Sequence, residues 1–150
     1  MLAYWRDDRL RTLAVPIIAQ VAVCTRLQMP EARTALSECL VTMVEAVSDD
    51  MLVKKINLDI LMHTRAEDAR LRLYALTCSE ALWRTHGTKL MGTFLPLSLS
   101  RINSYLCSTG FAGETATFVA ECAEDDNDSV VRESHRLKDA IESVAGRIDV

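Results

Sequence analysis

An aspartate that is followed three residues later by an apolar residue and four residues later by Lys or Arg occurs four times in this chain. The four copies begin at Asp7, Asp50, Asp68 and Asp128 and end at Arg11, Lys54, Arg72 and Arg132. Each copy opens a run of apolar residues with helical spacing. The aspartate can cap the first turn of such a helix, and the basic residue can pair with it one turn later. We therefore expect each of these aspartates to lie at a helix start, or within one residue of it.

The spacing of these aspartates indicates a repeat. Asp7 and Asp50 stand 43 residues apart, within the period of about 40–47 residues that HEAT and armadillo repeats show. Asp68 and Asp128 stand 60 residues apart, and leaving out the 17 residues 97–113 (LSLSRINSYLCSTGFAG) restores a separation of 43. Since that stretch is rich in Ser and Gly and has no clear apolar face, we interpret residues 97–113 as an insertion into a repeat.

The apolar periodicity predicts six antiparallel helices and no sheet. We expect helices over about 7–27, 30–47, 51–63, 67–86 with Gly87 as its C-terminal cap, Lys89 to 122 with an interruption at Pro96, and 129–145 with a stop at Gly146. The apolar stripes at 10/13/14/17/18/21 and 36/39/40/43/44/47 are expected to face each other. The predicted fold is all-α, a single HEAT/armadillo-like α-solenoid module over residues 1–150 with a right-handed superhelical stack.

Composition limits the function classes. The net charge of −4 and the pI of about 5.4 argue against a free-standing nucleic-acid binder, which is usually basic. The five cysteines are odd in number and form no CxxC pair, so we interpret them as buried small hydrophobes in a reducing compartment. No apolar run reaches the roughly 18 residues of a membrane span.

The sequence contains no recognisable catalytic or metal-binding motif. The three histidines lack metal-ligand spacing and are expected at helix ends or on polar faces. The acidic stretch from Glu121 to Asp128 lacks the spacing of an EF-hand, and we interpret it as a solvated turn between helices. We predict no enzyme activity, no cofactor and no metal. A helical-repeat DNA glycosylase would need a basic concave face, which the net charge opposes.

Five basic residues cluster around the turn between the third and fourth predicted helices: Lys54, Lys55, Arg65, Arg70 and Arg72. They fit a solvated face with intrahelical pairs, or a contact strip for RNA phosphates or an acidic partner. Trp83 is expected to be partly buried at the edge of the stack. Tyr4 and Trp5 have no visible partner in the chain and are candidate interface anchors.

Three stretches carry a resemblance to a known family. KKINLDILMHTRAEDARLRLYALTCSEALWRTHGTKL (54–90) and ETATFVAECAEDDNDSVVRESHRLKDAIESVAG (114–146) resemble the C-terminal end of the U3 small nucleolar RNA-associated protein 10 family. YWRDDRLRTLAVPIIAQVAVC (4–24) resembles the segment just upstream in fungal members. Members of this family are very large HEAT-repeat subunits of the small-subunit processome. The resemblance implies that this chain is a C-terminal fragment, and that residues 97–113 are a retained intron.

The resemblance also implies a function. It is that of a non-catalytic scaffold in nucleolar pre-18S rRNA processing and ribosome biogenesis, located in the nucleus and nucleolus. The expected partners are other processome proteins, with U3 snoRNA and pre-rRNA contacted indirectly, and without a membrane or a small-molecule substrate. A generic HEAT-repeat adaptor in transport or trafficking is the alternative, and it rests on the fold alone.

Overall fold

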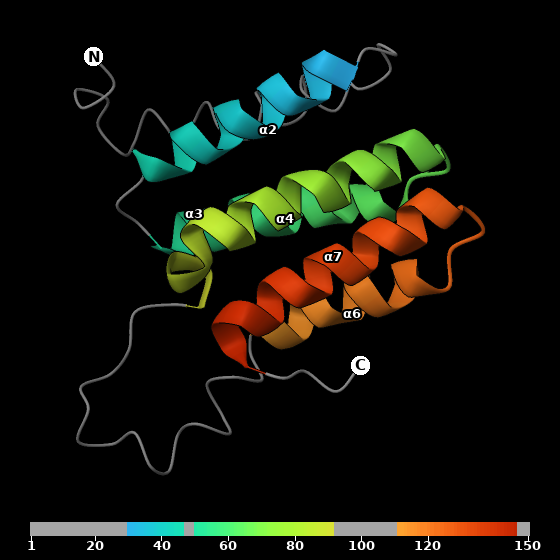
Figure 1. Ribbon diagram of the computed structural model, residues 1–150. Helices are drawn as coiled ribbons and strands as arrows, with labels where there is room; N and C mark the ends of the chain where they lie inside the picture. The colour runs from blue at the N-terminus through green and yellow to red at the C-terminus, as the bar shows by residue number, and fades with distance from the viewer. Residues whose placement is uncertain (1–29, 47–49, 92–110, 147–150) are drawn as a thin grey trace.

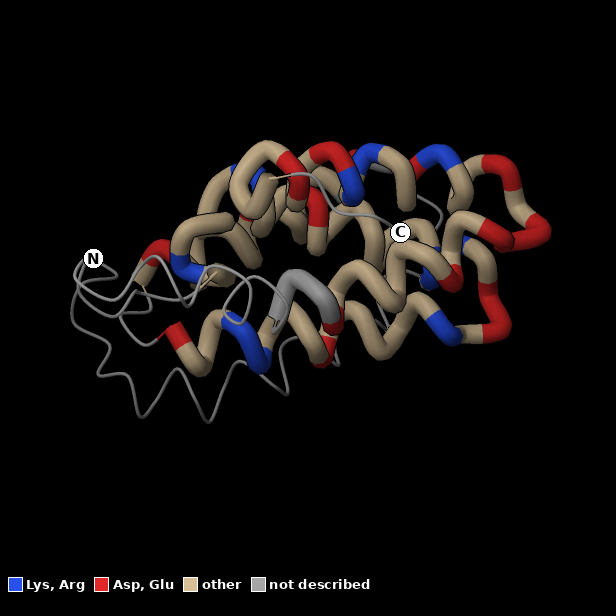
Figure 2. Tube along the Cα trace, turned by 90° about the horizontal axis from the view of Figure 1, so that it is seen from below, with Lys and Arg blue, Asp and Glu red and all other residues tan. Residues whose placement is uncertain are grey.

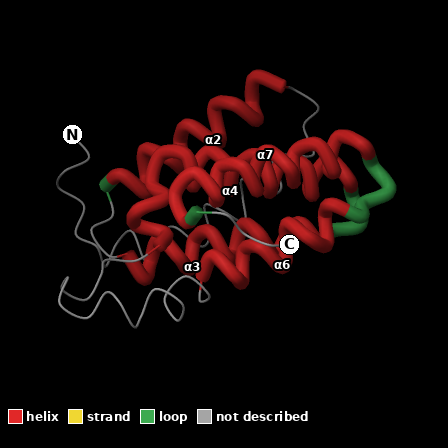
Figure 3. The backbone as a smooth tube through the Cα atoms, turned by 60° about the horizontal axis from the view of Figure 1, so that its bottom comes forward, coloured by secondary structure: helices red, strands yellow, loops and turns green. Residues whose placement is uncertain are grey.

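The computed structural model describes residues 30–46, 50–91 and 111–146, and this part of the chain consists of helices and short turns without a strand (Figures 1 and 3). The elements are α2 (Pro30–Glu45), α3 (Asp50–Leu61), the short 3-10 helix η2 (Met62–Arg65), α4 (Ala69–Met91), α6 (Phe111–Ala123) and α7 (Asp128–Ala145). The predicted all-α class is confirmed, while the predicted helix over 7–27 lies outside the described residues. The HEAT-type repeat and its handedness stay predictions.

The helices form three layers (Figure 1). α3 pairs with α4, α6 pairs with α7, and α2 runs along α4 on the side opposite to α7. α4 and α7 make the most extensive contact in the described part of the chain. The turn between α3 and α4 and the turn between α6 and α7 lie at the same end of the two pairs. This stacking of helix pairs is compatible with an α-solenoid.

One continuous apolar core joins the three layers, and α4 lies at its centre. Trp83, in the middle of α4, is 0% exposed. The expectation that Trp83 is only partly buried was therefore wrong. α2 covers α4 on one side and α7 covers it on the other, so the middle of α4 lies inside the core. Burial of a large apolar side chain of this kind stabilises the folded state by about 1.5–3 kcal/mol.

The helix break expected near Gly87 is present as a kink in α4. His86 has non-helical backbone angles, with φ of −125° and ψ of 24°, and a short second helical segment follows it to Met91. Gly87 is buried, and a Cβ atom placed there would lie 2.6 Å from Val144 Cγ2 of α7. Gly87 therefore permits a close approach of α4 to α7 and is not a helix cap. Lys89, near which a new helix was predicted to begin, lies in the helical segment after this kink, in the last turn of α4.

The last turns of α4 bind the C-terminal carbonyl groups of α2. His86 is buried, and its Nε2 lies 3.0 Å from the Val41 carbonyl oxygen. Lys89 Nζ donates to the Val44 carbonyl oxygen at 3.1 Å. His86 lies at the predicted helix end, but the interpretation of it as a surface residue was wrong, because α2 covers it. A cation at a helix C-terminus is favoured by the carbonyl groups that have no helical partner.

Only part of the predicted apolar stripe of α2 is buried. Leu40 and Val44 pack into the core, Leu36 and Met43 are half-buried, and Cys39 is exposed. The stripe that was expected to face it, at 10–21, lies outside the described residues, as does Val47.

Among the described cysteines, Cys78 and Cys122 are buried as predicted, and burial raises the pKa of the Cys78 thiol to about 12. The interpretation of Cys39 as a buried residue was wrong, because its side of α2 does not face α4. None of the described helices combines the length and the apolar character needed to cross a membrane.

Residues 111–113, the last three of the predicted insertion 97–113, belong to the first turn of α6. The predicted helical continuation therefore begins at Phe111 and not at Glu114. Residues 97–110 lie outside the described residues, so the interpretation of the stretch as an insertion stays a prediction.

Candidate functional site

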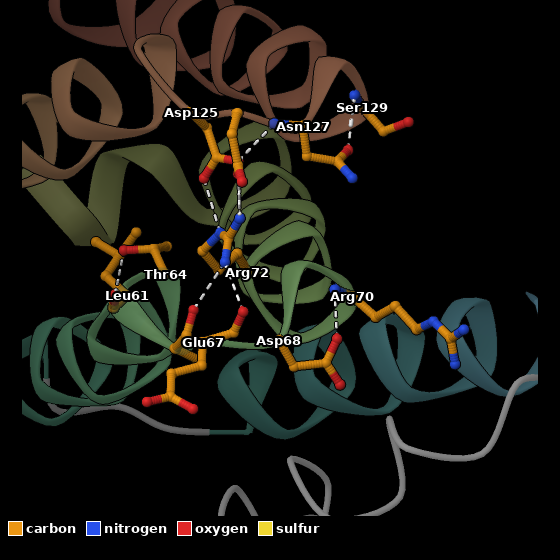
Figure 4. Close-up of polar contacts among 11 residues, drawn as sticks. Leu61, Thr64, Glu67, Asp68, Arg70, Arg72, Asp125, Asn127 and Ser129 are labelled. Atoms are coloured by element: carbon orange, nitrogen blue, oxygen red, sulfur yellow. Dashed lines mark hydrogen bonds and ion pairs between the residues drawn. The ribbon is translucent and has the colours of Figure 1, made fainter.

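The basic cluster predicted from the sequence is spread over three elements: Lys54 and Lys55 lie in α3, Arg65 in η2, and Arg70 and Arg72 at the start of α4, where Figure 4 shows the last two. Asp68 caps α4, because its Oδ1 accepts a hydrogen bond from the Arg70 backbone N–H at 2.9 Å. Its own carbonyl oxygen accepts the first helical bonds, from the backbone N–H groups of Leu71 and Arg72. The predicted capping role of Asp68 is confirmed.

Arg72, one turn into α4, makes polar contacts on two sides (Figure 4). Its Nη1 donates to the carbonyl oxygens of Ala66 at 3.0 Å and of Glu67 at 2.9 Å, both in the turn before α4. Its Nη2 donates to Asp125 Oδ1 at 2.8 Å and to Asp126 Oδ1 at 2.9 Å, and its Nε lies 2.7 Å from Asp125 Oδ2. The guanidinium therefore binds the turn of one helix pair to the turn of the next.

Arg65, in η2, forms a second link between the same two helix pairs. Its Nε and Nη2 donate to the two carboxylate oxygens of Glu121 in α6, at 2.8 and 2.7 Å. Its guanidinium also lies over the Phe118 ring, 4.6 Å from the centroid. Both side chains of the ion pair are about half exposed, 50% for Arg65 and 44% for Glu121. Water therefore screens this pair more than the pair of Arg72 with Asp125.

The charges of these pairs shift the pKa values of their carboxyl groups. Hydrogen bonding from Arg72 holds the pKa of Asp125 below its ordinary value, with a smaller contribution from the Asn127 backbone N–H, while burial opposes the shift. Arg65 lowers the pKa of Glu121 in the same way. The carboxylates therefore stay ionised around neutral pH, and they neutralise two of the five basic residues.

The other three basic residues lie on helix surfaces. Lys55 and Arg70 are exposed, and Lys54 is half-buried on α3. The structure thus divides the predicted cluster into two arginines bound by carboxylates of the chain itself and a smaller set on the surface. A contact with RNA phosphates or an acidic partner stays a prediction, and the exposed Lys55 and Arg70 are the residues most available for it.

The partner of Arg72 was not predicted. The sequence pattern suggested a pair of Asp68 with Arg72 within one helix, but Arg72 binds Asp125 and Asp126, and the Asp68 carboxylate caps the helix instead. The acidic turn was interpreted as solvated, and this is wrong for Asp125, whose side chain is only 9% exposed. The sequence signal for this contact was the excess of acidic residues in the turn between α6 and α7, which favours a basic partner such as Arg72.

The other two motif aspartates in the described residues also lie at helix starts. Asp50 is the first residue of α3 and Asp128 the first residue of α7, while Asp7 lies outside the described residues. At α7 the capping side chain is that of Asn127, whose Oδ1 accepts from the Ser129 backbone N–H at 3.0 Å. The predicted positions are confirmed, but the residue that caps α7 is the one before the aspartate.

Acidic residues gather at the end of the two helix pairs where their turns lie, as Figure 2 shows. Within the described residues, no group of three or more His, Cys, Asp or Glu side chains has an arrangement that would hold a metal ion. In this part of the chain, the charges at this end include the paired side chains that bridge the two helix pairs.

Comparison with known proteins does not assign the chain to a family. No protein-family model matches the chain, and no solved structure is similar to it.

Proposed function

We propose that this chain is a non-catalytic scaffold module of the small-subunit processome, acting in nucleolar pre-18S rRNA processing and ribosome biogenesis. The observation that carries the proposal is the resemblance of residues 54–90 and 114–146 to the C-terminal end of the U3 small nucleolar RNA-associated protein 10 family. These two stretches cover most of the two stacked helix pairs, α3 with α4 and α6 with α7.

The arrangement of the helices supports a scaffold. A stack of helix pairs exposes a long surface relative to its core and offers it to partner proteins. The links from Arg72 to Asp125 and from Arg65 to Glu121 connect one pair to the next. A module built in this way can keep the relative orientation of the surfaces that its partners bind.

Tagging the full-length product of the gene in its own cell tests this proposal. A processome subunit is expected in the nucleolus and is expected to co-purify with U3 snoRNA. Its depletion should stall the maturation of 18S rRNA and leave the large-subunit RNAs less affected. A product on cytoplasmic vesicles without pre-ribosomal RNA would instead support the alternative, a HEAT-repeat adaptor in transport or trafficking.

A charge-reversal experiment tests whether the basic strip takes part. The variant carrying Lys55→Glu and Arg70→Glu should lower the recovery of U3 snoRNA with the tagged protein if the strip binds phosphates, since both side chains are exposed. The matched control is Glu114→Lys, an exposed position on α6. Equal recovery of U3 snoRNA with both variants would exclude a direct contact by these two residues.

A further inference from the structure

Three helices of the described chain, α2, α4 and α7, lie side by side and run in the same direction (Figure 1). α4 contacts both of the others. α3 packs against α4, α6 packs against α7, and α3 and α6 also contact each other. They therefore lie on the same side of the three parallel helices (Figure 3). We call the opposite side, which no other described helix covers, the outer face.

Contacts with the neighbouring helices determine which residues of α4 lie on the outer face. Gly87 approaches α7, Lys89 bonds to α2 and Ser79 bonds to α3. Successive residues of an α-helix are rotated by about 100° around its axis, so these three contacts leave one sector of α4 open. The basic residues of this sector, Arg70 and Arg84, are both exposed. They are 14 positions apart, which corresponds to about 21 Å along the helix.

The outer face of α7 follows from its contact with α4, which Val144 makes. Because the two helices are parallel, the residues of α7 on the outer face are rotated by about a quarter turn from Val144, on the side away from α6. Arg132 and Arg136 occupy this sector, one helical turn apart, and both are exposed. Along the helix axis they lie between the levels of Arg70 and Arg84. The four arginines therefore follow the line along which α4 and α7 meet.

Two of these arginines are held by glutamates that are less exposed than they are. Arg84 Nε donates to Glu80 Oε1 at 2.7 Å, and Arg136 Nη1 donates to Glu133 Oε2 at 3.3 Å. The arginine side chains are 55% and 60% exposed, whereas the glutamate side chains are 16% and 9% exposed. Each guanidinium therefore keeps donors for a further partner, while its carboxylate is largely withdrawn from the surface.

The other two arginines, Arg70 and Arg132, have no ion-pair partner in the described part of the chain. Figure 4 shows the Arg70 side chain extending away from the other labelled residues. The exposed acidic residues of α7 nearest to this face, Asp128 and Asp139, lie on the next row of that helix, further from α4. The outer face over α4 and α7 is therefore predominantly positive. We call it the arginine strip, and it consists of Arg70, Arg84, Arg132 and Arg136.

α2 carries the opposite charge on the same face. Glu31, Glu38 and Glu45 are exposed and stand seven residues apart, so they form one row along the helix. The row lies on the outer side of α2, because Leu40 and Val44 on its other side pack into the core. The charges of the outer face are therefore segregated, with a glutamate row beside the arginine strip.

The surroundings of the strip favour a polypeptide over a nucleic acid as its partner. In α4 both aromatic side chains, Tyr74 and Trp83, are buried, and α2 and α7 contain no aromatic residue of the Phe, Tyr or Trp type. The outer face therefore offers no side chain on which bases could stack. The net charge of −4 and the glutamate row also repel a long polyanion.

Carboxylates fit the arginines of the strip, because a guanidinium binds them through paired N–H groups. We propose that the arginine strip binds an acidic segment of a partner protein, whose Asp and Glu carboxylates pair with the guanidinium groups along the line where α4 and α7 meet. The glutamate row of α2 repels the segment and so confines it to α4 and α7. The proposal does not depend on the assignment of the chain to the processome.

Fluorescence anisotropy with the whole 150-residue chain tests the proposal. The probe is a fluorescein-labelled peptide of about ten glutamates, which is long enough to span the strip. Arg132→Gln should weaken its binding about three- to fivefold, since an exposed ion pair contributes up to about 1 kcal/mol. Lys55→Gln removes the same charge from an exposed position on α3 and is the matched control. Equal weakening by the two variants, or no binding of the peptide to the wild type, would overturn the proposal.

Two further measurements test the class of partner and the place where it binds. An RNA of about ten uridines with the same label carries a similar charge, and it should bind more weakly than the glutamate peptide. Tighter binding of the RNA would overturn the choice of partner. When the peptide is added to 15N-labelled protein, the largest changes in amide chemical shift should fall in α4 and α7. Changes concentrated in α3 and α6 would show that the arginine strip is not the binding surface.

Discussion

The Arg72 guanidinium, at the start of α4, lies 2.7 Å from the Asp125 carboxylate in the turn between α6 and α7. The two residues are 53 positions apart in the sequence. Their side chains are only 14% and 9% exposed, so this ion pair is more shielded from water than the other pairs of the described chain that span two helix pairs. It fixes the two helix pairs at the end where their turns lie.

We predict that Arg72→Met lowers the free energy of unfolding by about 3 kcal/mol, since it leaves the poorly exposed Asp125 carboxylate without its counter-charge. Methionine retains most of the aliphatic stem, so the loss reports on the charge and its hydrogen bonds. The free energy is measured by urea unfolding. The control is Lys138→Met, which removes the long, partly exposed 4.0 Å pair with Glu142 within one helix and should cost less than about 0.5 kcal/mol. Equal losses would contradict a special role for Arg72.

The two caps at the starts of α4 and α7 lead to a second prediction. Asp68→Ala should lower stability by about 1 kcal/mol, because the Arg70 backbone N–H loses its acceptor. Asn127→Ala should have a similar effect on α7, whereas Asp128→Ala should have a smaller one, because its neighbour is the cap. Thermal unfolding of the three variants gives the order, and a larger loss for Asp128→Ala than for Asn127→Ala would show that the cap is assigned to the wrong residue.

The sequence predicted the features that depend on local pattern. The helix expected over 129–145 is α7, Asp128–Ala145, because its apolar period is strong and Gly146, with φ of 84°, ends it. Asp68 was also identified as a cap from local sequence, since it stands directly before an apolar run with helical spacing. The carboxylate bound by Arg72 depends on residues 53 positions away. Helical periodicity contains no information about such a distance.

Gly87 shows the same limit for the fold. In sequence it has the features of a helix end, since it is a glycine that follows a helical run. Its structural role depends on Val144, which approaches from another helix pair. The burial of Trp83 likewise depends on α2 and α7 lying on two sides of α4. A single amphipathic pattern indicates which face of a helix is apolar, and it does not indicate how many neighbours will cover that helix.

The close approach at Gly87 leads to a third prediction. Gly87→Ala should destabilise the protein by about 1–3 kcal/mol, because the new methyl group would lie 2.6 Å from Val144 Cγ2. Combining it with Val144→Ala should cost less than the sum of the two single changes, since the smaller side chain makes room. A double-mutant cycle of unfolding free energies measures this coupling. Additive costs would mean that Gly87 is required for another reason.

A buried polar contact between α3 and α4 gives a fourth prediction. Asn57 and Ser79 are both 0% exposed, and Ser79 Oγ donates to Asn57 Oδ1 at 2.8 Å. Asn57 Nδ2 has no hydrogen-bond partner in the described part of the chain. Ser79→Ala should therefore cost about 1–3 kcal/mol, because it leaves a buried acceptor unpaired as well.

Replacing both members of this contact should be less harmful than replacing one. Asn57→Leu combined with Ser79→Ala removes every unpaired polar group at the site and substitutes apolar side chains of suitable size. We expect the stability of this double variant to be close to that of the wild type, as measured by urea unfolding. A double variant less stable than Ser79→Ala alone would show that the amide has a further role in the core.

The fifth prediction concerns acid. Folding lowers the pKa of the Asp125 carboxyl, mainly through its bonds from Arg72. The folded chain therefore binds this proton less tightly than the unfolded chain. The stabilisation is complete above the ordinary pKa of aspartate, and it is lost as the pH falls through the lowered value. Asp125→Asn removes the ionisable group, so the stability of this variant should fall less steeply than that of the wild type between about pH 5 and pH 2.

Glu121 provides the comparison for this acid titration. Its pKa is also lowered, by Arg65, but its side chain is 44% exposed and solvent screens the pair. Glu121→Gln should therefore change the acid slope of the unfolding free energy less than Asp125→Asn does. Urea unfolding midpoints collected at each pH for the wild type and the two variants give the slopes. A steeper acid slope in Asp125→Asn than in the wild type would mean that the carboxylate does not stabilise the contact between the helix pairs, and that Arg72 acts through its bonds to Ala66 and Glu67 alone.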